Sequence, residues 1–262
     1  MFEGKVIWIT GASSGIGEAL AYEWSKLGAR LILSARRESE LERVKAACAH
    51  SDRCTVAPLD LSRQDDIEAT ADRMLQQFGC IDILVNNGGV SQRSLVVETD
   101  LSVDRRIMEV DYFSGVALSK KLLPAMIAKG SGHIVAVSSI VGKFGFPMRS
   151  AYSAAKHAMH GFYESLWAEL HAQGIRVTVA CPGRILTNIS LHAITKDGTP
   201  HGVMDHAQAN GIKAEVCARK IIKAVRKNKK ETYIGKIDLL MIYFRRYIPW
   251  LYYKLVSKVK PK

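Results

Sequence analysis

The chain has 262 residues, of which 48% are hydrophobic and 24% charged, and its formal net charge is +12. This is enough for one large α/β domain with a buried core. The five cysteines form no C-x-x-C pair, which argues against a zinc site or a disulfide framework and indicates a reducing, cytoplasmic compartment. We therefore expect no bound metal.

The positive charge is concentrated near the C-terminus. Residues 213–262 contain 15 Lys or Arg and 3 acidic residues, so the preceding part of the chain is neutral. A polyanionic partner would have to bind through this segment rather than through the main fold. We do not expect a nucleic acid to be that partner.

Short apolar runs alternate with amphipathic stretches, and the first run begins too close to Met1 to leave room for a secretion signal. The pattern predicts strands over residues 5–10, 30–35, 54–59, 81–86, 133–138 and 176–181, with helices between them. Runs that are apolar at every position are typical of a parallel sheet covered on both faces. The predicted fold class is therefore α/β, a doubly wound Rossmann-type sheet. We expect a single domain over residues 1–235, with a lid at about 188–211 and a tail over 236–262.

A glycine-rich turn, Thr10-Gly11-Ala12-Ser13-Ser14-Gly15-Ile16-Gly17, follows the first predicted strand and opens the first helix. Glycines permit a tight turn, let a pyrophosphate approach the backbone and allow the helix to pack near the strand. The alternative is that the turn only separates two elements. We predict that a dinucleotide binds at Gly11, Ser13, Ser14, Gly15, Ile16 and Gly17.

The end of the second predicted strand indicates which nicotinamide cofactor binds. An acidic residue there accepts a hydrogen bond from a ribose 2′-hydroxyl, whereas an arginine pairs with a 2′-phosphate. The sequence reads Ala35-Arg36-Arg37, without a carboxylate. We therefore predict NADP (NADPH) rather than NAD, with Arg36 on the phosphate. The alternative is that both arginines are solvated at a helix start.

Ser139, Tyr152 and Lys156 predict the chemistry. Residues 151–173 have a helical pattern, so Tyr152 and Lys156, four positions apart, lie on one face. An ammonium beside a phenol favours the phenolate and makes the group a usable acid and base near neutral pH. Ser139 would hold the substrate oxygen. The same spacing at Tyr22 and Lys26 lacks a preceding apolar run that ends in a serine pair.

Together these segments resemble the short-chain dehydrogenase/reductase family over roughly residues 5–235. The resemblance implies that Tyr152 is the general acid/base, that Lys156 assists it and holds the nicotinamide ribose, and that Ser139 orients the carbonyl or alcohol. It also implies a homo-oligomer. Three further segments match the family: Asp60-Leu61, Asn86-Asn87-Gly88-Gly89, and Pro182-Gly183 followed by Thr187. The resemblance implies that the cofactor is contacted at Asp60, Leu61, Asn86 and Thr187.

Two positions depart from the family pattern. Gly88 stands where alanine is usual, and we expect little effect from this. Asp111 stands where the family has an asparagine whose backbone carbonyl anchors a water leading to the lysine. An aspartate at this position could pair with Lys156 and either weaken the effect of that lysine on Tyr152 or extend the proton relay. Alternatively, Asp111 only satisfies backbone groups of its helix.

The tail mixes apolar, aromatic and basic side chains. Arg245 and Arg246 interrupt any run approaching the ~20 apolar residues that a transmembrane helix requires. The composition suits an interfacial segment on an anionic membrane surface. The alternative is that the tail covers its own active-site entrance or packs at a subunit interface.

The sequence thus predicts an NADP-dependent oxidoreductase that interconverts a carbonyl and a secondary alcohol by hydride transfer. The alternative is a cofactor-binding scaffold or regulatory protein with little turnover, but the intact Ser139, Tyr152 and Lys156 favour catalysis. Six residues suggest an apolar pocket for a lipid-like ketone or alcohol: Phe144, Phe146, Met148, Leu191, Val203 and Met204.

Overall fold

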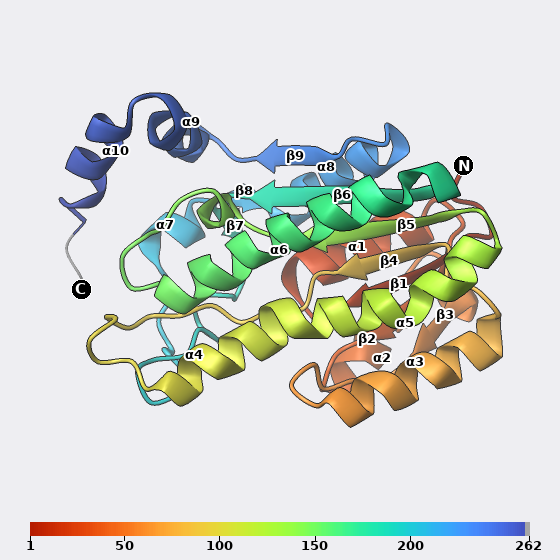
Figure 1. The fold of residues 1–262 in the computed structure, drawn as a ribbon. Coiled ribbons are helices and arrows are strands. Elements are labelled where there is room, and N and C mark those ends of the chain that lie inside the picture. The colour runs from red at the N-terminus through yellow and green to blue at the C-terminus, as the bar shows by residue number, and fades with distance from the viewer. Residues whose placement is uncertain (260–262) are drawn as a thin grey trace.

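A seven-stranded parallel sheet forms the centre of the computed structural model, which describes residues 1–259 (Figure 1). The strand order is β3-β2-β1-β4-β5-β6-β9. A separate pair consists of β7 (Ile185–Leu186) and β8 (Ile212–Lys213). The strands of the large sheet are β1 (Val6–Thr10), β2 (Arg30–Ser34), β3 (Cys54–Val56), β4 (Ile83–Asn86), β5 (Gly132–Val137), β6 (Ile175–Pro182) and β9 (Glu231–Ile234).

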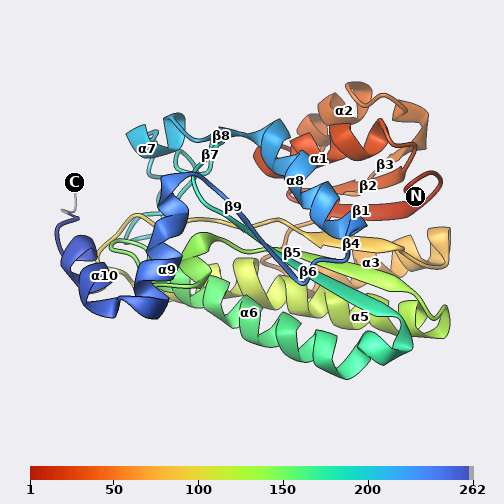
Figure 2. The same cartoon turned by 90° about the horizontal axis from the view of Figure 1, so that it is seen from above.

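Helices cover both faces of the sheet (Figure 2). One face packs against α1 (Gly15–Ser25), α2 (Glu38–Ala46) and α8 (Ala214–Arg226), and the other against α3 (Gln64–Phe78), α5 (Ser114–Ala128) and α6 (Ser150–Leu170). Strand β1 shows why its residues are all apolar: Ile7 and Ile9 enter the first core, while Val6 and Trp8 enter the second. The predicted doubly wound sheet is confirmed.

All six predicted strands are present, with ends that differ by at most three residues. The seventh strand of the sheet, β9, was not predicted. It follows a lysine-rich turn, and three of its four residues are only partly buried at the sheet edge. The short polar sequence Glu231-Thr232 gives little hydrophobic signal for a strand.

The remaining helices frame the carboxyl end of the sheet. Helix α4 (Leu101–Met108) continues through a π-helical segment, Glu109–Phe113, into α5. The predicted lid contains the short helix α7 (His206–Ala209), and backbone hydrogen bonds join its Ile194 to Ser91 and Arg93 after β4. The tail forms α9 (Leu240–Tyr247) and α10 (Pro249–Val256), which lie near the lid, at the end toward which the strands point (Figure 1). The boundary at residue 235 stays a prediction.

No helix between residues 1 and 259 combines the length and the apolar character needed to cross a lipid bilayer.

Candidate active site

A cavity of about 490 Å³ opens where β1, β2, β4, β5 and β6 end. Its walls include the glycine-rich turn, the residues after β2 and β4, and Ser139, Tyr152 and Lys156. The carboxyl end of a parallel sheet, where the strand order reverses, is where ligands bind in open α/β folds. The topology therefore brings most of the predicted cofactor and catalytic residues to one place, but Gly17 and Asn86 do not line the cavity.

The glycine-rich turn packs too closely against neighbouring atoms of the chain to accept side chains at Gly11 and Gly17. Gly11 has φ +64°, and a Cβ on it would lie 2.8 Å from Gly88 Cα. A Cβ on Gly17 would collide with the carbonyl oxygen of Gly11. The side chain of Asn87 fastens this arrangement, since its Nδ2 donates to Thr10 O at 2.9 Å. The turn thus holds the N-terminus of α1 directly at the cavity, in the geometry that binds phosphate groups.

Charged residues after β2 and β3 form the other end of the cavity. Arg36, Arg37, Asp60 and Leu61 line it. Burial raises the pKa of Asp60, but hydrogen bonds from Ser62 and the charge of Arg36 outweigh it and lower the pKa. Arg36 is therefore an exposed cation close to a carboxylate.

Ser139 occupies the turn that follows β5. Its Oγ donates to Pro182 O at 3.3 Å and accepts from Val141 N at 3.4 Å. These bonds fix the hydroxyl between the ends of β5 and β6, at the wall of the cavity that also contains Tyr152.

Tyr152 and Lys156 lie one turn apart on α6, as predicted. The Lys156 ammonium is 5.5 Å from the centre of the Tyr152 ring, and both side chains are buried at the cavity. Lys156 Nζ also donates to Val137 O at 3.3 Å. The ammonium is thereby held between the tyrosine and the end of β5.

The π-helical segment places Asp111 against this lysine. Asp111 Oδ2 is 3.1 Å from Lys156 Nζ, and Oδ1 accepts from Val90 N at 2.7 Å. Burial disfavours the charged ammonium, but the Asp111 carboxylate more than compensates and raises the pKa of Lys156. Burial also raises the pKa of Asp111, against the opposing effect of Lys156. We infer that Lys156 is positively charged at neutral pH, because its ammonium has both a carboxylate and a carbonyl oxygen as partners.

The second Tyr-x-x-x-Lys spacing is structural. The Tyr22 hydroxyl donates to Glu18 at 2.7 Å, and Lys26 pairs with Glu23 at 3.0 Å. Burial and the Glu18 hydrogen bond raise the pKa of Tyr22 to about 12. This tyrosine cannot exchange protons near neutral pH.

Asn86 does not present its side chain to the cavity. Its Nδ2 donates to Tyr163 OH at 2.8 Å and to Ser119 Oγ at 3.2 Å, between α5 and α6. The following residues Asn87, Gly88 and Gly89 line the cavity instead. The cofactor contact implied for Asn86 therefore has no support from its side chain.

Gly88 has a local explanation. A Cβ at this position would collide with Cδ1 of Leu61, which fills the space that a methyl group would occupy. Thr187 lies at the opposite wall, where its Cγ2 would be 3.0 Å from a Cβ on Gly15. Leu61 and Thr187 thus bracket the glycine-rich turn.

The six residues predicted to form an apolar pocket do not line the cavity. Phe144 instead packs edge-on against Tyr252 of the tail, with ring centres 5.9 Å apart. The cavity wall contains Arg93, Arg106 and Arg149, which the sequence analysis did not single out. These arginines are separated in sequence and belong to no motif, so only the fold brings them together.

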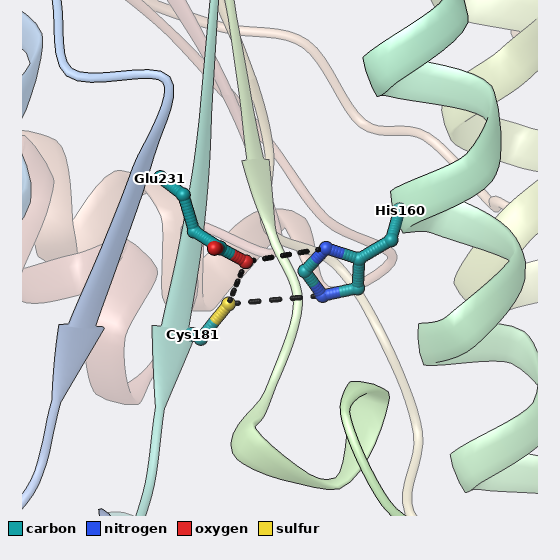
Figure 3. A group of neighbouring side chains, drawn as sticks. All are labelled: His160, Cys181 and Glu231. Atoms are coloured by element: carbon teal, nitrogen blue, oxygen red, sulfur yellow. Dashed lines mark hydrogen bonds and ion pairs between the residues drawn. The ribbon is translucent and has the colours of Figure 1, made fainter. Parts of the chain in front are cut away.

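A polar cluster lies beside the active site, on the far side of Ser138. His160 Nε2 is 3.7 Å from Cys181 Sγ, and His160 Nδ1 is 3.5 Å from Glu231 Oε1 (Figure 3). These side chains are of the types that bind metal ions. No sequence motif predicted that they would lie together. Lys143 Nζ, however, lies 2.6 Å from Glu231 Oε1. The lysine already supplies the cation that this carboxylate requires.

The family described as short chain dehydrogenase matches residues 5–197. Among curated proteins, "Dehydrogenase/reductase SDR family protein 7-like" of Drosophila melanogaster is 42% identical over an alignment of 261 residues, which covers 97% of this chain and 80% of that protein when gaps are left out. "Dehydrogenase/reductase SDR family member 7B" of Bos taurus is also 42% identical, over 96% of this chain and 80% of that protein.

Solved structures give the same result for the fold. A short-chain dehydrogenase from Streptomyces avermitilis has a TM-score of 0.82 and 29% identity, covering 97% of this chain and 96% of that one. A metagenomic short-chain oxidoreductase in complex with NADP has a TM-score of 0.74 and 28% identity, covering 89% of this chain and 97% of that one. A Burkholderia phymatum protein in complex with NAD, at 24% identity and a TM-score of 0.84, covering 100% of this chain and 97% of that one, adds support for the fold alone.

Proposed function

This chain belongs to the short-chain dehydrogenase family of oxidoreductases, and we propose that it interconverts a carbonyl and a secondary alcohol with NADP, using Tyr152 as the general acid and base. One observation carries this proposal: the Lys156 ammonium lies 5.5 Å from the Tyr152 ring at the wall of the cavity. A cation at this distance stabilises the phenolate relative to the phenol.

The cavity suits a nicotinamide dinucleotide because the closely packed glycine-rich turn holds the N-terminus of α1 at its wall. Ser13, Ser14, Gly15 and Ile16 would hold the pyrophosphate at the N-terminus of α1. Lys156 and Thr187 would hold the nicotinamide half. When bound, the cofactor supplies or accepts the hydride.

The side chains of the chain supply the proton. In reduction the Tyr152 hydroxyl donates its proton to the substrate oxygen, and in oxidation the phenolate takes that proton back. Ser139 Oγ, fixed by Pro182 O, orients the oxygen. Lys156 stabilises the phenolate, while Asp111 and Val137 O keep the ammonium in place.

The preference for NADP follows from the charges after β2. Arg36 and Arg37 line the cavity beside Asp60, and position 35 has only a methyl side chain. A guanidinium attracts a 2′-phosphate, and nothing at Ala35 repels it.

The direct test is Tyr152→Phe in an active preparation. We expect turnover of ketones, aldehydes and secondary alcohols to fall to background while NADPH binding, followed by fluorescence titration, and thermal stability persist. Undiminished turnover in this variant would contradict the chemistry. A wild-type protein that binds NADPH but turns over none of these substrate classes would be a scaffold.

We further propose that the C-terminal tail, residues 236–262, binds an anionic membrane surface. Tyr247 and Trp250 are 74% and 68% exposed, next to the exposed Arg245 and Arg246. Tyr252 faces inward and donates to Gly145 O. One side of the tail therefore packs on its own chain, while the other side presents aromatic and basic groups suited to an anionic lipid surface. Such a surface would lie at the cytoplasmic side of a membrane, which agrees with the five free cysteines.

A further inference from the structure

Three arginines from separate segments reach the cavity. Arg93 follows β4, Arg106 belongs to α4, and Arg149 directly precedes α6. Arg93 Nη2 and Arg149 Nη2 lie 2.5 Å and 3.1 Å from the same oxygen, Oδ2 of Asp205 in the lid. Arg106 also lies beside the lid, because its Nη1 would be 3.8 Å from a Cβ on Gly198.

These cations exceed the anions available to them. Asp205 is one carboxylate shared by two guanidinium groups. Within residues 1–259, no carboxylate oxygen lies within 4.0 Å of the Arg106 guanidinium. The Arg93 side chain is only 6% exposed, and its guanidinium donates to both carboxylate oxygens of Asp205. Arg149 therefore has only a shared carboxylate oxygen as its partner.

Arg149 shows the effect of this imbalance. Burial, followed by the charge of Arg93, lowers the pKa of Arg149 to about 10, despite the opposing charge of Asp205. A guanidinium is normally charged under all conditions in proteins. A further negative charge near Arg149 would therefore stabilise its guanidinium.

The cofactor does not account for these arginines. The 2′-phosphate would lie at Arg36, at the end of the cavity formed after β2, and the pyrophosphate at the N-terminus of α1. Arg149, in contrast, precedes Tyr152 by three residues, and a negative charge on Tyr152 would favour the charged form of Arg149. The surplus charge thus lies beside the group that exchanges a proton with the substrate.

We propose that the substrate is a carbonyl compound bearing an oxyanion, either a phosphate or a carboxylate, and that Arg149 and Arg106 bind this group. Arg93 and Asp205 would hold the lid against the bound anion. This inference rests on the proposed function, since it assigns the substrate class of the same site. The competing account is that Asp205 only fastens the lid to two arginines, with no ligand anion involved.

Binding can be measured without turnover. The protein saturated with NADPH, which covers the cofactor phosphate sites, is titrated with inorganic phosphate in a calorimeter against potassium chloride of equal ionic strength. We expect saturable binding of phosphate that weakens roughly tenfold or more in Arg106→Gln. Arg105→Gln removes an arginine that is exposed, as Arg106 is, but does not line the cavity, and this variant should leave the affinity unchanged. Absence of saturable binding, or equal effects of the two variants, would overturn the proposal.

Matched substrates then distinguish the two anions. Keto acids are compared with their methyl esters, and hydroxyketone phosphates with the same hydroxyketones. We expect kcat/KM to be roughly 10- to 100-fold higher for one anionic series than for its neutral counterpart. Arg149→Met should abolish this preference, and Arg149→Lys should retain part of it.

The outcomes separate this inference from the proposed function. Phosphate binding that depends on Arg106, with no turnover of any carbonyl, would leave the anion site intact and refute the reductase. Turnover with an equal or greater kcat/KM for the neutral compounds would refute the anion site and leave the reductase intact.

Discussion

Lys156 Nζ lies 3.1 Å from Oδ2 of Asp111, and the side chains are 4% and 0% exposed. The ammonium that acts on Tyr152 thus has a carboxylate partner of its own. Because opposite charges this close partly cancel, Asp111 weakens the attraction between Lys156 and a Tyr152 phenolate.

Asp111→Asn should shift the pH dependence of alcohol oxidation. Removal of the carboxylate leaves the lysine charge free to act on a phenolate, so the rising limb of the pH–rate profile should move toward acid. The measurement is kcat/KM against pH with one alcohol substrate. An unchanged limb would show that only the backbone at this position matters.

The same variant should lower stability, because it leaves a buried ammonium without its carboxylate. Breaking such a pair costs about 3 kcal/mol or more. Denaturant unfolding measures this, and Asp104→Asn on α4 serves as the control because Asp104 lies outside the cavity.

Ala35→Asp should reverse the cofactor preference. The new carboxylate would stand beside Arg36, repel a 2′-phosphate and accept a hydrogen bond from a 2′-hydroxyl. We expect kcat/KM for NADPH to fall roughly 10- to 100-fold while that for NADH rises. Steady-state kinetics with both cofactors and one substrate give the ratio, and an unaltered ratio would place the 2′-phosphate elsewhere.

The sequence predicted those parts of the molecule that are determined by residues close together in the chain. Apolar runs predicted six of the seven strands of the central sheet, and the four-residue spacing predicted that Tyr152 and Lys156 lie on one helix face. The edge strand β9 was not predicted, because it begins with polar residues and is mostly half-buried. Its place in the sheet depends on pairing with β6 rather than on its own composition.

Side-chain direction and long-range grouping could not be predicted. Asn86 stands in a cofactor motif, yet its amide turns toward Tyr163 on α6. Arg93, Arg149 and Asp205 meet only because the segment 188–211 folds back over the residues after β4. No periodicity in the sequence encodes such a contact, since its members come from different elements.

The exposed side of the tail should bind anionic vesicles. Tyr247→Ala combined with Trp250→Ala removes apolar insertion, and Arg245→Gln with Arg246→Gln removes roughly 1 kcal/mol of attraction per charge. We expect sedimentation with phosphatidylserine-containing vesicles to fall in both double variants, and only the second to lose its salt dependence. Val97→Ala, at another exposed apolar position, should behave as wild type.

A second copy of the chain is the competing partner for this surface. From Leu239 onward the sequence contains no acidic residue, so two such surfaces placed face to face would bring like charges together. Binding to neutral phosphatidylcholine as strong as to anionic vesicles, or dimerisation lost in Arg245→Gln, would contradict the membrane assignment.

His160 should make the fold sensitive to mild acid. Burial, followed by the charge of Lys143, lowers the pKa of His160 from 6.5 to about 4, so the folded protein keeps the imidazole neutral while the unfolded chain protonates it. The free energy of unfolding is therefore highest above pH 6.5 and falls as the pH drops toward 4, by up to about 3 kcal/mol. Carboxylates with lowered pKa values, such as Glu231, lose most of their contribution below pH 4.5, so the comparison is made above that pH. We expect His160→Gln to flatten unfolding curves between pH 6.5 and 4.5, leaving the part that buried His133 contributes. His171→Gln, at an exposed position, should retain the full slope; an equal slope in His160→Gln would show that the imidazole is not held neutral by the fold.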